Sequence, residues 1–176
     1  IALGNYRTID TASVNGIPFF CTSGVGFDAH IGKLFATSTK RGLQSYVKIT
    51  IREIFNYKPS RYKINIDGKV IEREAFLMTV ANAGQYGNDF YIAPQALLND
   101  GLFHLVILKP FPLLKGIGAV IKVLRRKANE SALIETFTGK DIVVTRENPD
   151  SIHFDGEPDI QGKELVYKIH PNSLKV

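Results

Sequence analysis

Short apolar runs separated by turn residues limit the folds that are open to this sequence. Two of the runs, Phe76–Ala81 and Leu102–Leu108, are apolar on both faces, which is typical of strands in the interior of a sheet. Between Arg61 and Ile66 apolar and polar residues alternate, which predicts a half-exposed strand leading into a hairpin turn at Asp67-Gly68. Further strands are predicted as two over 5–27, joined by an Asn15-Gly16 turn, and one each over Ile142–Thr145 and Leu165–His170.

Two other segments have the spacing of helices. Apolar residues recur every three or four positions from Leu43 to Phe55, and Pro59 ends this helix. A second helix is predicted over 113–124, with a lowered propensity because the segment contains glycine. Strands dominate and the helices interrupt them. We therefore predict a mainly β domain of the α+β class, an antiparallel β-sandwich-like structure with two inserted helices rather than alternating βαβ units.

Length and composition limit the class of protein. A chain of 176 residues fits one domain, and a hydrophobic content of 44% is enough for a sizeable core. No stretch approaches the roughly 20 apolar residues of a membrane-spanning helix, and the N-terminus lacks the layout of a signal peptide. We therefore expect a soluble, cytoplasmic protein. Cys21 is the only cysteine, which excludes an intrachain disulfide, and the histidines lack the spacing of zinc ligands, so we expect no zinc site.

Basic residues are concentrated in one segment. From Lys40 to Lys63 there are seven lysines and arginines against Glu53 alone, while the net charge of the whole chain is +5. A second basic cluster, over 122–127, closes the second predicted helix. Such clusters attract an anionic membrane surface, and a solvated helix face also explains them. No nucleic-acid-binding motif accompanies the charge, so we expect no nucleic acid partner.

A glycine pair leads into the first candidate site residue. In the segment Gly24-Val25-Gly26-Phe27-Asp28 the glycines allow a ligand to approach the backbone, and Asp28 could then face a phosphate-bound cation. The third glycine of a dinucleotide-binding fingerprint is missing. The structural alternative is a turn or the start of a helix, with Asp28 as N-cap.

Two acidic turns adjoin apolar runs and supply the other candidates. In Asn99-Asp100-Gly101 the carboxylate and nearby main-chain carbonyls are suitable ligands for a hard cation, or the segment is a simple hairpin turn. In Phe154-Asp155-Gly156-Glu157 the last side chain precedes Pro158 and is suited to a rigidly placed general base, or the segment is an ordinary surface turn.

The order of these motifs resembles that of one protein family. GVGFDA comes first, then AN…YG…AP-A-L-NDGL, then FDGE, in a stretch from about Asn5 to the C-terminus. This order is similar to that in the C-terminal domain of the superfamily that contains diacylglycerol kinase, sphingosine kinase and ceramide kinase, and most of all to the bacterial lipid kinases. The resemblance implies a β-sandwich, the second domain of a two-domain fold like that of NAD kinase and diacylglycerol kinase.

The resemblance also implies a missing part. Family members bind ATP through a Gly-Gly-Asp-Gly-Thr loop in an N-terminal α/β domain, whereas this sequence contains no Gly-Gly dipeptide and begins with Ile1. We therefore expect residues 1–176 to be the C-terminal lipid-kinase domain, on the substrate side of the cleft, with the N-terminal ATP-binding domain absent from this chain. Such a fragment is expected to be inactive by itself.

By resemblance, the intact protein is an ATP-dependent lipid kinase that acts on diacylglycerol or a related lipid. Glu157 matches the general base that deprotonates the lipid hydroxyl as this oxygen attacks the γ-phosphorus of ATP. Two alternatives stay open. One is a kinase of a soluble acceptor, as in the NAD kinases, and the other is a non-catalytic β-sandwich that binds lipid.

The resemblance assigns ligands for the cofactors, Mg²⁺ and ATP. Asp100 matches a carboxylate that binds a structural Mg²⁺, with the main-chain carbonyls of Leu97 and Leu102 as further ligands. Asp28, assisted by Asp155, is expected in the acidic network that joins this ion to the magnesium of ATP. These roles require the acids at positions 28, 100 and 157 to converge on one rim of the folded domain.

Overall fold

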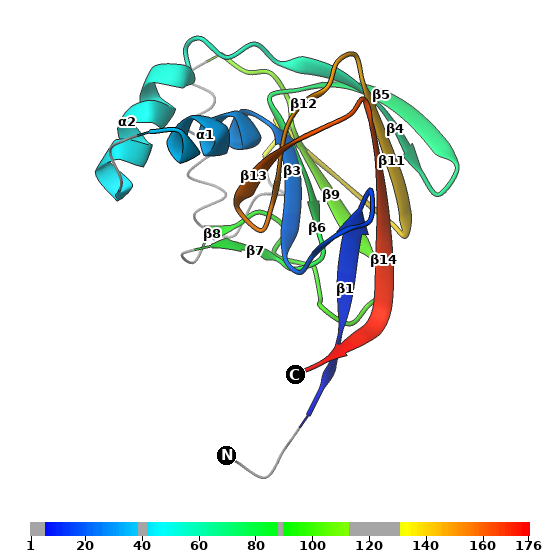
Figure 1. The fold of residues 1–176 in the computed structure, drawn as a ribbon. Coiled ribbons are helices and arrows are strands. Elements are labelled where there is room, and N and C mark those ends of the chain that lie inside the picture. The colour runs from blue at the N-terminus through cyan, green and yellow to red at the C-terminus, as the bar shows by residue number, and fades with distance from the viewer. Residues whose placement is uncertain (1–5, 39–41, 88–89, 113–130) are drawn as a thin grey trace.

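Two antiparallel β-sheets packed face to face form the body of the molecule (Figure 1). The computed structural model describes residues 6–38, 42–87, 90–112 and 131–176. Sheet A contains, in spatial order, β2 (Ile17–Phe19), β1 (Thr8–Val14), β14 (Glu164–Lys175), β11 (Asp141–Arg146), β4 (Ser60–Ile66) and β5 (Lys69–Ala75). Sheet B contains β10 (Ile134–Gly139), β9 (Phe103–Leu108), β6 (Leu77–Ala81), β3 (Thr22–Gly26), β12 (Asp150–Phe154) and β13 (Glu157–Gln161), and β7 (Gln85–Gly87) pairs separately with β8 (Phe90–Tyr91). The predicted mainly β, sandwich-like fold is confirmed.

Three two-residue turns set the register of their hairpins. Asn15-Gly16 joins β1 to β2, Asp67-Gly68 joins β4 to β5, and Asp155-Gly156 joins β12 to β13. The first residue of each turn has φ of 49° or 50°, and the glycine has φ between 83° and 92°. Turns of this type match the twist of the strands, and asparagine, aspartate and glycine adopt them most easily. The first two turns confirm the predictions made from the sequence.

Side chains from both sheets fill the space between them. Phe19 of sheet A stacks on Phe103 of sheet B with 6.2 Å between the ring centroids, and Tyr167 meets both rings edge-on. All three side chains are at most 1% exposed, so truncating either phenylalanine to alanine would cost about 3–5 kcal/mol of stability. In sheet B, β6 and β9 are buried on both faces, which confirms that they are interior strands.

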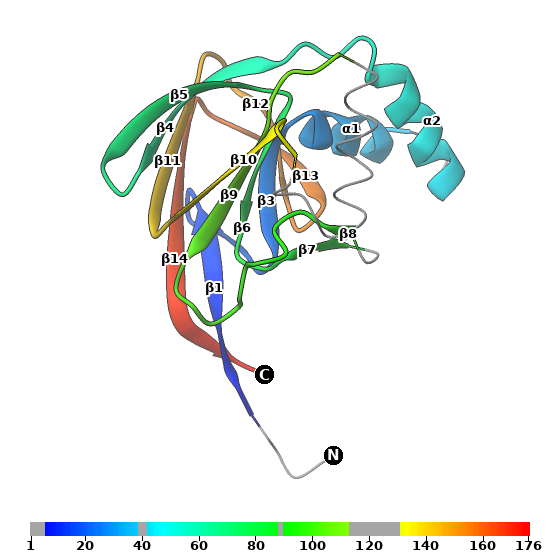
Figure 2. The same cartoon turned by 180° about the vertical axis from the view of Figure 1, so that it is seen from behind.

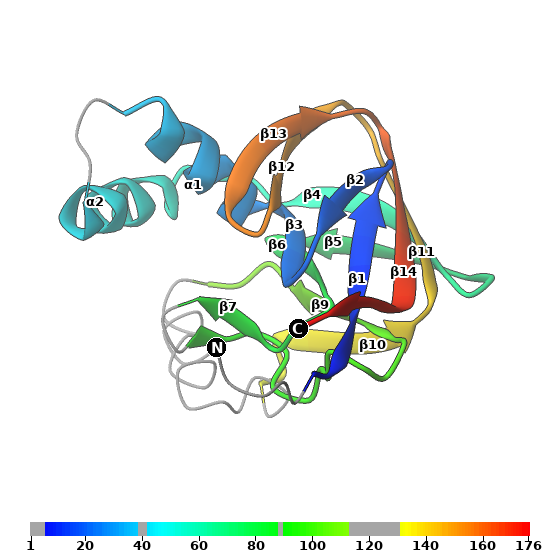
Figure 3. The same cartoon turned by 60° about the horizontal axis from the view of Figure 1, so that its bottom comes forward.

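The part of the chain that the structure describes contains two helices, and only the second lies where the sequence predicted one. α1 (Phe27–Ala36) starts directly after β3 with Gly26 as its N-cap, and α2 (Leu43–Glu53) follows beside it, away from the sheets (Figure 3). The alternative that placed Asp28 at the start of a helix is confirmed, but the N-cap is Gly26 and not Asp28, because the helix starts one residue before Asp28. The other predicted helix, over 113–124, and the basic cluster over 122–127 lie outside the described residues.

α1 covers the outer face of sheet B. Phe27 and Ile31 pack with Phe76 in an apolar cluster, and the Phe27 and Phe76 rings lie 4.5 Å apart between centroids. Tyr57, which follows α2, meets both of these rings edge-on. α1 also contacts β3 and β12. It contacts β13 as well, so this packing fixes α1 beside the β12–β13 hairpin that carries Asp155 and Glu157.

A cluster of ion pairs joins an edge strand of sheet A to an edge strand of sheet B. Glu135 of β10 accepts hydrogen bonds from Arg73 of β5, at 2.6 Å, and from the Lys109 side chain after β9, at 2.8 Å. β5 is one of the two edge strands of sheet A, and β10 is one of the two edge strands of sheet B. The hydrogen bonds from Lys109 and then from Arg73 lower the pKa of Glu135.

β1 and β14 extend beyond the sandwich as a two-stranded ribbon (Figures 1 and 2). Arg7 and Val176 pair at its far end through two main-chain hydrogen bonds of 2.9 Å. At its root the register between the strands shifts at Asp10, which is buried. The Asp10 carboxylate accepts main-chain hydrogen bonds from Gly101, at 2.7 Å, and from Asn172, at 2.8 Å. The ribbon is therefore tied to the loop that precedes β9.

Candidate functional site

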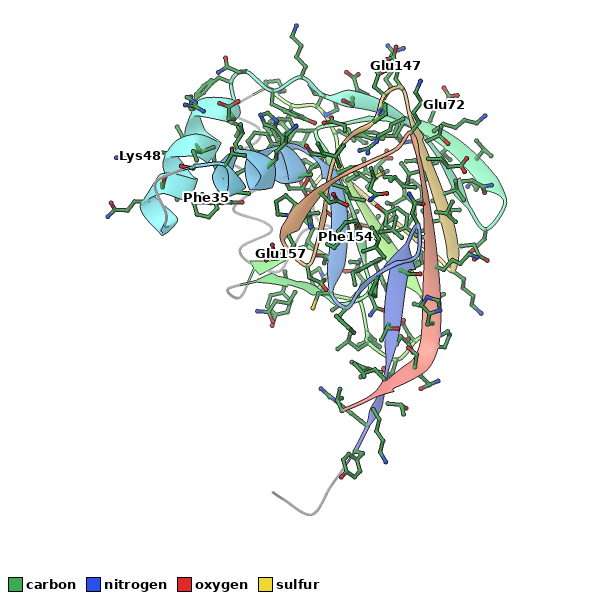
Figure 4. All side chains as sticks on the ribbon, in the orientation of Figure 1. Phe35, Lys48, Glu72, Glu147, Phe154 and Glu157 are labelled. Atoms are coloured by element: carbon green, nitrogen blue, oxygen red, sulfur yellow. The ribbon has the colours of Figure 1, made fainter. Side chains whose placement is uncertain are left out.

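A hollow of about 380 Å³ lies between α1, α2 and the β12–β13 hairpin. Figure 4 labels two of the residues that line it, Phe35 of α1 and Glu157 of β13. The lining combines two carboxylates with apolar residues, which is the usual composition of a small-molecule site. The full lining consists of Asp28, Gly32, Phe35, Ala36, Tyr46, His153, Gly156, Glu157 and Pro158.

A larger hollow, of about 560 Å³, lies along β4, β5 and β11, where Figure 4 labels Glu72 and Glu147. Its lining consists mostly of charged side chains, and none of the predicted site residues is among them. Arg61 and Lys63, from the basic segment of the sequence, lie here and not with the helices. The smaller hollow is the better candidate because it holds two of the predicted acids.

Asp28 lies in the first turn of α1, where the helix dipole favours a negative charge. Its Oδ1 accepts the main-chain N–H of Ala29 at 2.8 Å, and its Oδ2 lies 3.0 Å from Nε2 of His153. The Asp28 side chain is 12% exposed and the His153 side chain is 4% exposed. The start of α1 thus places a largely buried, hydrogen-bonded carboxylate at the hollow.

The sequence did not indicate His153 as a site residue. It lies on β12 directly opposite Gly24 of β3, and both strands run beneath α1. A Cβ atom at position 24 would lie 2.5 Å from Nε2 of His153 and 2.6 Å from Oδ2 of Asp28. Glycine is therefore required at position 24 for this pair to form, and the glycine pair in the sequence was the available signal.

Glu157 is exposed and begins β13, paired with Phe154 across the hairpin turn. The turn is anchored by Asp155, whose carboxylate accepts the main-chain N–H groups of three consecutive residues, from the end of β2 to the first residue of β3. These bonds, from Phe20, Cys21 and Thr22, measure 2.7, 2.8 and 2.9 Å. Asp155 thereby holds the turn from which Glu157 projects, and its assistance to an acidic network stays a prediction.

Asp100 lies in a turn that leads into β9. Its Oδ1 accepts the main-chain N–H of Leu102 at 3.0 Å, and its Oδ2 lies 3.6 Å from Nε2 of the buried His104. Gly101 has φ of 67°, and Leu97, earlier in the same loop, has an exposed side chain. The hairpin alternative for this segment is wrong, because β9 pairs with β6 and β10 and not with the strand before the turn.

The hollow contains two of the three predicted acids. Asp28 and Glu157 line the same hollow, and Asp100 is not among its lining residues. The Asp100 turn and the Asp155-Gly156 turn lie at the same end of sheet B, but β6 and β3 separate β9 from β12. The structure thus brings Asp28 and Glu157 to one hollow, and a common rim with Asp100 stays a prediction.

The Asp100 turn has the donors for a weakly held hard cation. No group of three or more histidine, cysteine, aspartate or glutamate side chains suited to a metal occurs within the described part of the chain. A cation at Asp100 would thus have one carboxylate, with main-chain carbonyls and water as its remaining ligands. Mg²⁺ is commonly bound in this way, because it keeps several waters. The residues present fit a partly hydrated Mg²⁺.

Tyrosines around the hollow stay protonated at neutral pH. Burial, followed by the negative charge of Asp28, raises the pKa of Tyr46, which lines the hollow. Burial, with Asp150 and Asp28 adding to it, raises the pKa of Tyr57 to about 12. Tyr46 therefore presents a neutral phenol, a hydrogen-bond donor and acceptor, at the edge of the site.

Residues 22–176 match the family model described as the "YegS C-terminal NAD kinase beta sandwich-like domain". The chain belongs to this family. It is 28% identical over 157 residues to the diacylglycerol kinase of Bacillus subtilis, covering 88% of this chain and 52% of that protein. It is also 28% identical over 180 residues to a Citrobacter koseri protein named "Probable lipid kinase YegS-like", covering 98% and 57%. The resemblance predicted from the three motifs is confirmed.

The fold of this YegS-type domain is similar to that of a diacylglycerol kinase from Bacillus anthracis. The crystal structure of that enzyme matches with a TM-score of 0.68 and 20% sequence identity, over 97% of this chain and 53% of that chain. At this identity the match shows the fold alone. The chain spans about half the length of the curated relatives that it matches.

Proposed function

We propose that this chain is the substrate-side domain of an ATP-dependent kinase that transfers the γ-phosphate of ATP to the hydroxyl of a lipid, diacylglycerol or a related one. The observation that carries the proposal is the hollow, where Asp28 and Glu157 meet an apolar wall that includes Phe35 and Pro158. A lipid fits this arrangement with its hydroxyl beside the carboxylates and hydrocarbon along the apolar wall. The names of the relatives, diacylglycerol kinase and lipid kinase, support the reaction class.

Glu157 is the proposed general base. Its exposed carboxylate at the hollow is accessible to a lipid hydroxyl. It would take the hydroxyl proton as the oxygen forms its bond to the γ-phosphorus, and the bond from that phosphorus to the oxygen of the leaving ADP would break. Most of the remaining catalysis is positioning, to which the Asp155 anchor contributes by fixing the hairpin.

The cofactors of the proposed kinase are ATP and Mg²⁺. ATP would be bound mainly by a further domain that carries the Gly-Gly-Asp-Gly-Thr loop, so that this chain is expected to be inactive alone. Asp100, with the main-chain carbonyls of Leu97 and Leu102, would hold a structural Mg²⁺ away from the hollow, and Asp28 would face the nucleotide side. Bound magnesium neutralises phosphate charge in such reactions.

The test of the proposed function is the variant Glu157→Gln in the two-domain protein, assayed with labelled ATP and dispersed diacylglycerol. Turnover should fall by about 10²–10⁴-fold, the usual contribution of a general base. The melting temperature should not change, because the side chain is exposed. Glu164→Gln, at another exposed strand position, is the matched control and should keep full turnover. Full turnover in Glu157→Gln would contradict the assignment of the base.

Two other outcomes of this assay would assign a different function to the protein. Phosphorylation of a water-soluble alcohol but not of lipid would indicate a kinase of a soluble acceptor, related in its reaction to the NAD kinases. Lipid binding without any phosphorylation by the parent two-domain protein would indicate a non-catalytic β-sandwich. The apolar wall of the hollow favours the lipid kinase over the first of these.

We also propose that α2 meets an anionic membrane surface on the cytoplasmic side. Val47, Ile51 and Phe55 recur every four residues along α2 and the turn after it, and they are 43%, 59% and 66% exposed. Lys48 and Arg52 are also exposed on α2, and Figure 4 shows Lys48 at the outer side of that helix. Exposed apolar side chains beside basic ones are typical of helices that lie in a membrane interface. Among the described helices, none has the length and apolar character to cross a membrane.

Sedimentation with vesicles tests this contact on the chain itself. Binding to vesicles with phosphatidylglycerol should exceed binding to neutral ones, and Ile51→Ser with Phe55→Ser should weaken it by about 2 kcal/mol, a factor of about 30. Val70→Ser removes an apolar side chain that is 52% exposed on β5 and should leave binding unchanged. The pair Lys48→Glu and Arg52→Glu should weaken binding at low salt only. Equal binding by all variants would refute the contact.

A further inference from the structure

We propose that His153 is a positioning residue that holds the Asp28 carboxylate in the hollow, and that Gly24 is glycine so that this pair can form. The inference rests on the proposed function only for its kinetic consequence. The pair itself is a property of the folded chain, with Nε2 of His153 3.0 Å from Oδ2 of Asp28.

The pair is built from three elements that the fold brings together. Asp28 comes from the first turn of α1, Gly24 from β3, and His153 from β12, at the position that pairs with Gly24 across the sheet. His153 is four residues before Glu157 on the same hairpin. Both of these residues line the hollow together with Asp28. The imidazole therefore links the proposed base hairpin to the helix that carries Asp28.

Gly24 is required by space and not by backbone conformation. Its φ lies outside the left-handed region that glycine alone adopts easily, unlike the φ of 103° at Gly26. A Cβ at position 24 would instead enter the gap between the two partners, at 2.5 Å from the imidazole nitrogen and 2.6 Å from the carboxylate oxygen. These contacts are far shorter than van der Waals distances. A side chain here would separate His153 from Asp28.

The hydrogen bond decides where the carboxylate points. A buried carboxylate needs hydrogen-bond donors, and Asp28 is only 12% exposed. With Oδ1 bonded to the Ala29 amide and Oδ2 beside the imidazole, the carboxylate is held at both oxygens. At metal sites, loss of a residue that orients a ligand side chain usually lowers affinity or activity by about 10–100-fold, and we expect an effect of that size here.

The first test needs neither metal nor nucleotide. In the isolated chain, nitrogen chemical shifts of the His153 ring by NMR report which ring nitrogen carries a proton. The proposal expects a proton on Nε2, donated to Asp28, and expects Gly24→Ala to change these shifts while the rest of the spectrum is retained. A neutral ring with its proton on Nδ1 alone, or a Gly24→Ala spectrum with unchanged His153 shifts, would overturn the proposal.

The second test separates positioning from simple packing, in the two-domain protein. His153→Leu keeps bulk without a donor and should lower kcat by about 10–100-fold with little change in KM for lipid. His153→Gln keeps an N–H at a similar reach and should recover most of the loss. His170→Leu, which removes an exposed imidazole bonded to Ser13, is the matched control and should keep full activity. Equal losses in His153→Leu and His153→Gln, in step with their melting temperatures, would make the role structural and overturn the proposal.

The two tests also separate this proposal from the proposed function. If the parent two-domain protein phosphorylates no lipid, the kinase assignment fails. The ring nitrogen shifts of His153 in the isolated chain still decide whether the pair exists.

Discussion

Replacing Asp155 gives the sharpest test of how the hairpin is held. The residue has two properties that separate cleanly by substitution: a left-handed backbone with φ of 49°, and a carboxylate that accepts three main-chain hydrogen bonds. Asp155→Gly keeps the backbone conformation and removes every acceptor. Asp155→Asn also keeps the backbone conformation, because asparagine tolerates this region, but it replaces one oxygen by an NH₂ group.

The structure sets the size of each effect. A hydrogen bond to a charged group contributes about 1.5–3 kcal/mol, and solvent exposure of Asp155 argues for about 1 kcal/mol each. Asp155→Gly should therefore lower the free energy of unfolding by about 3 kcal/mol, plus about 0.5 kcal/mol for the added chain entropy of glycine. In Asp155→Asn, the amide oxygen can still accept the Cys21 and Thr22 N–H groups. The NH₂ group then faces the Phe20 N–H, so the loss should be about 1–2 kcal/mol.

Urea unfolding of the purified chain measures both variants, and the reactivity of Cys21 gives a second readout. Burial, followed by the Asp155 charge, raises the pKa of the Cys21 thiol. Removing the charge removes the second cause, so the pKa should fall and a thiol reagent at pH 8 should react faster in Asp155→Asn than in the parent. The reasoning is refuted if both variants unfold within about 0.5 kcal/mol of the parent, the ordinary range of a surface substitution.

Three further predictions concern pH, metal and backbone. The lowered pKa of Glu135 means that its contribution to stability is complete above the unfolded value of 4.5 and is lost as pH falls below it. In Glu135→Gln, the free energy of unfolding measured with urea should fall less steeply as pH is lowered. An unchanged pH dependence would contradict this role of Glu135. Millimolar Mg²⁺ should raise the melting temperature of the parent chain but not of Asp100→Asn, and equal responses would argue against the Mg²⁺ site. Gly26→Ala should lower the stability measured by calorimetry more than Gly156→Ala, although both glycines have positive φ. A Cβ at position 26 would lie 2.8 Å from the Phe76 carbonyl oxygen, whereas position 156 is open. Equal losses of stability would contradict the clash.

The parts of the fold that local chemistry determines could be predicted from the sequence. The turns at Asn15-Gly16 and Asp67-Gly68 follow from residues that accept positive φ, and β6 and β9 follow from runs that are apolar on both faces. α1 could not be located in this way. It is short, it follows β3 without a polar N-cap, and Gly26 begins it through a backbone conformation that the sequence does not specify.

The candidate site depends on strand order, which local patterns do not contain. Glu157 and Asp28 line one hollow because β12 lies next to β3 and α1 contacts both strands. Asp100 is separated from them because β9 lies two strands further along the sheet, beyond β6. His153 was missed for the same reason, since its partner Asp28 is 125 residues away in the sequence.

The ribbon of β1 and β14 has a mechanical consequence. A neighbouring domain joined at either end would act on this same two-stranded ribbon. Two hydrogen-bonded strands resist sliding past each other but bend easily out of their plane. The two domains would thus tilt relative to each other about the base of the ribbon, where the Asp10 carboxylate accepts hydrogen bonds from Asn172 and Gly101. Any such tilt would be transmitted first to the loop beside Asp100. The conformation of the proposed cation-binding turn would therefore depend on the orientation of the neighbouring domain.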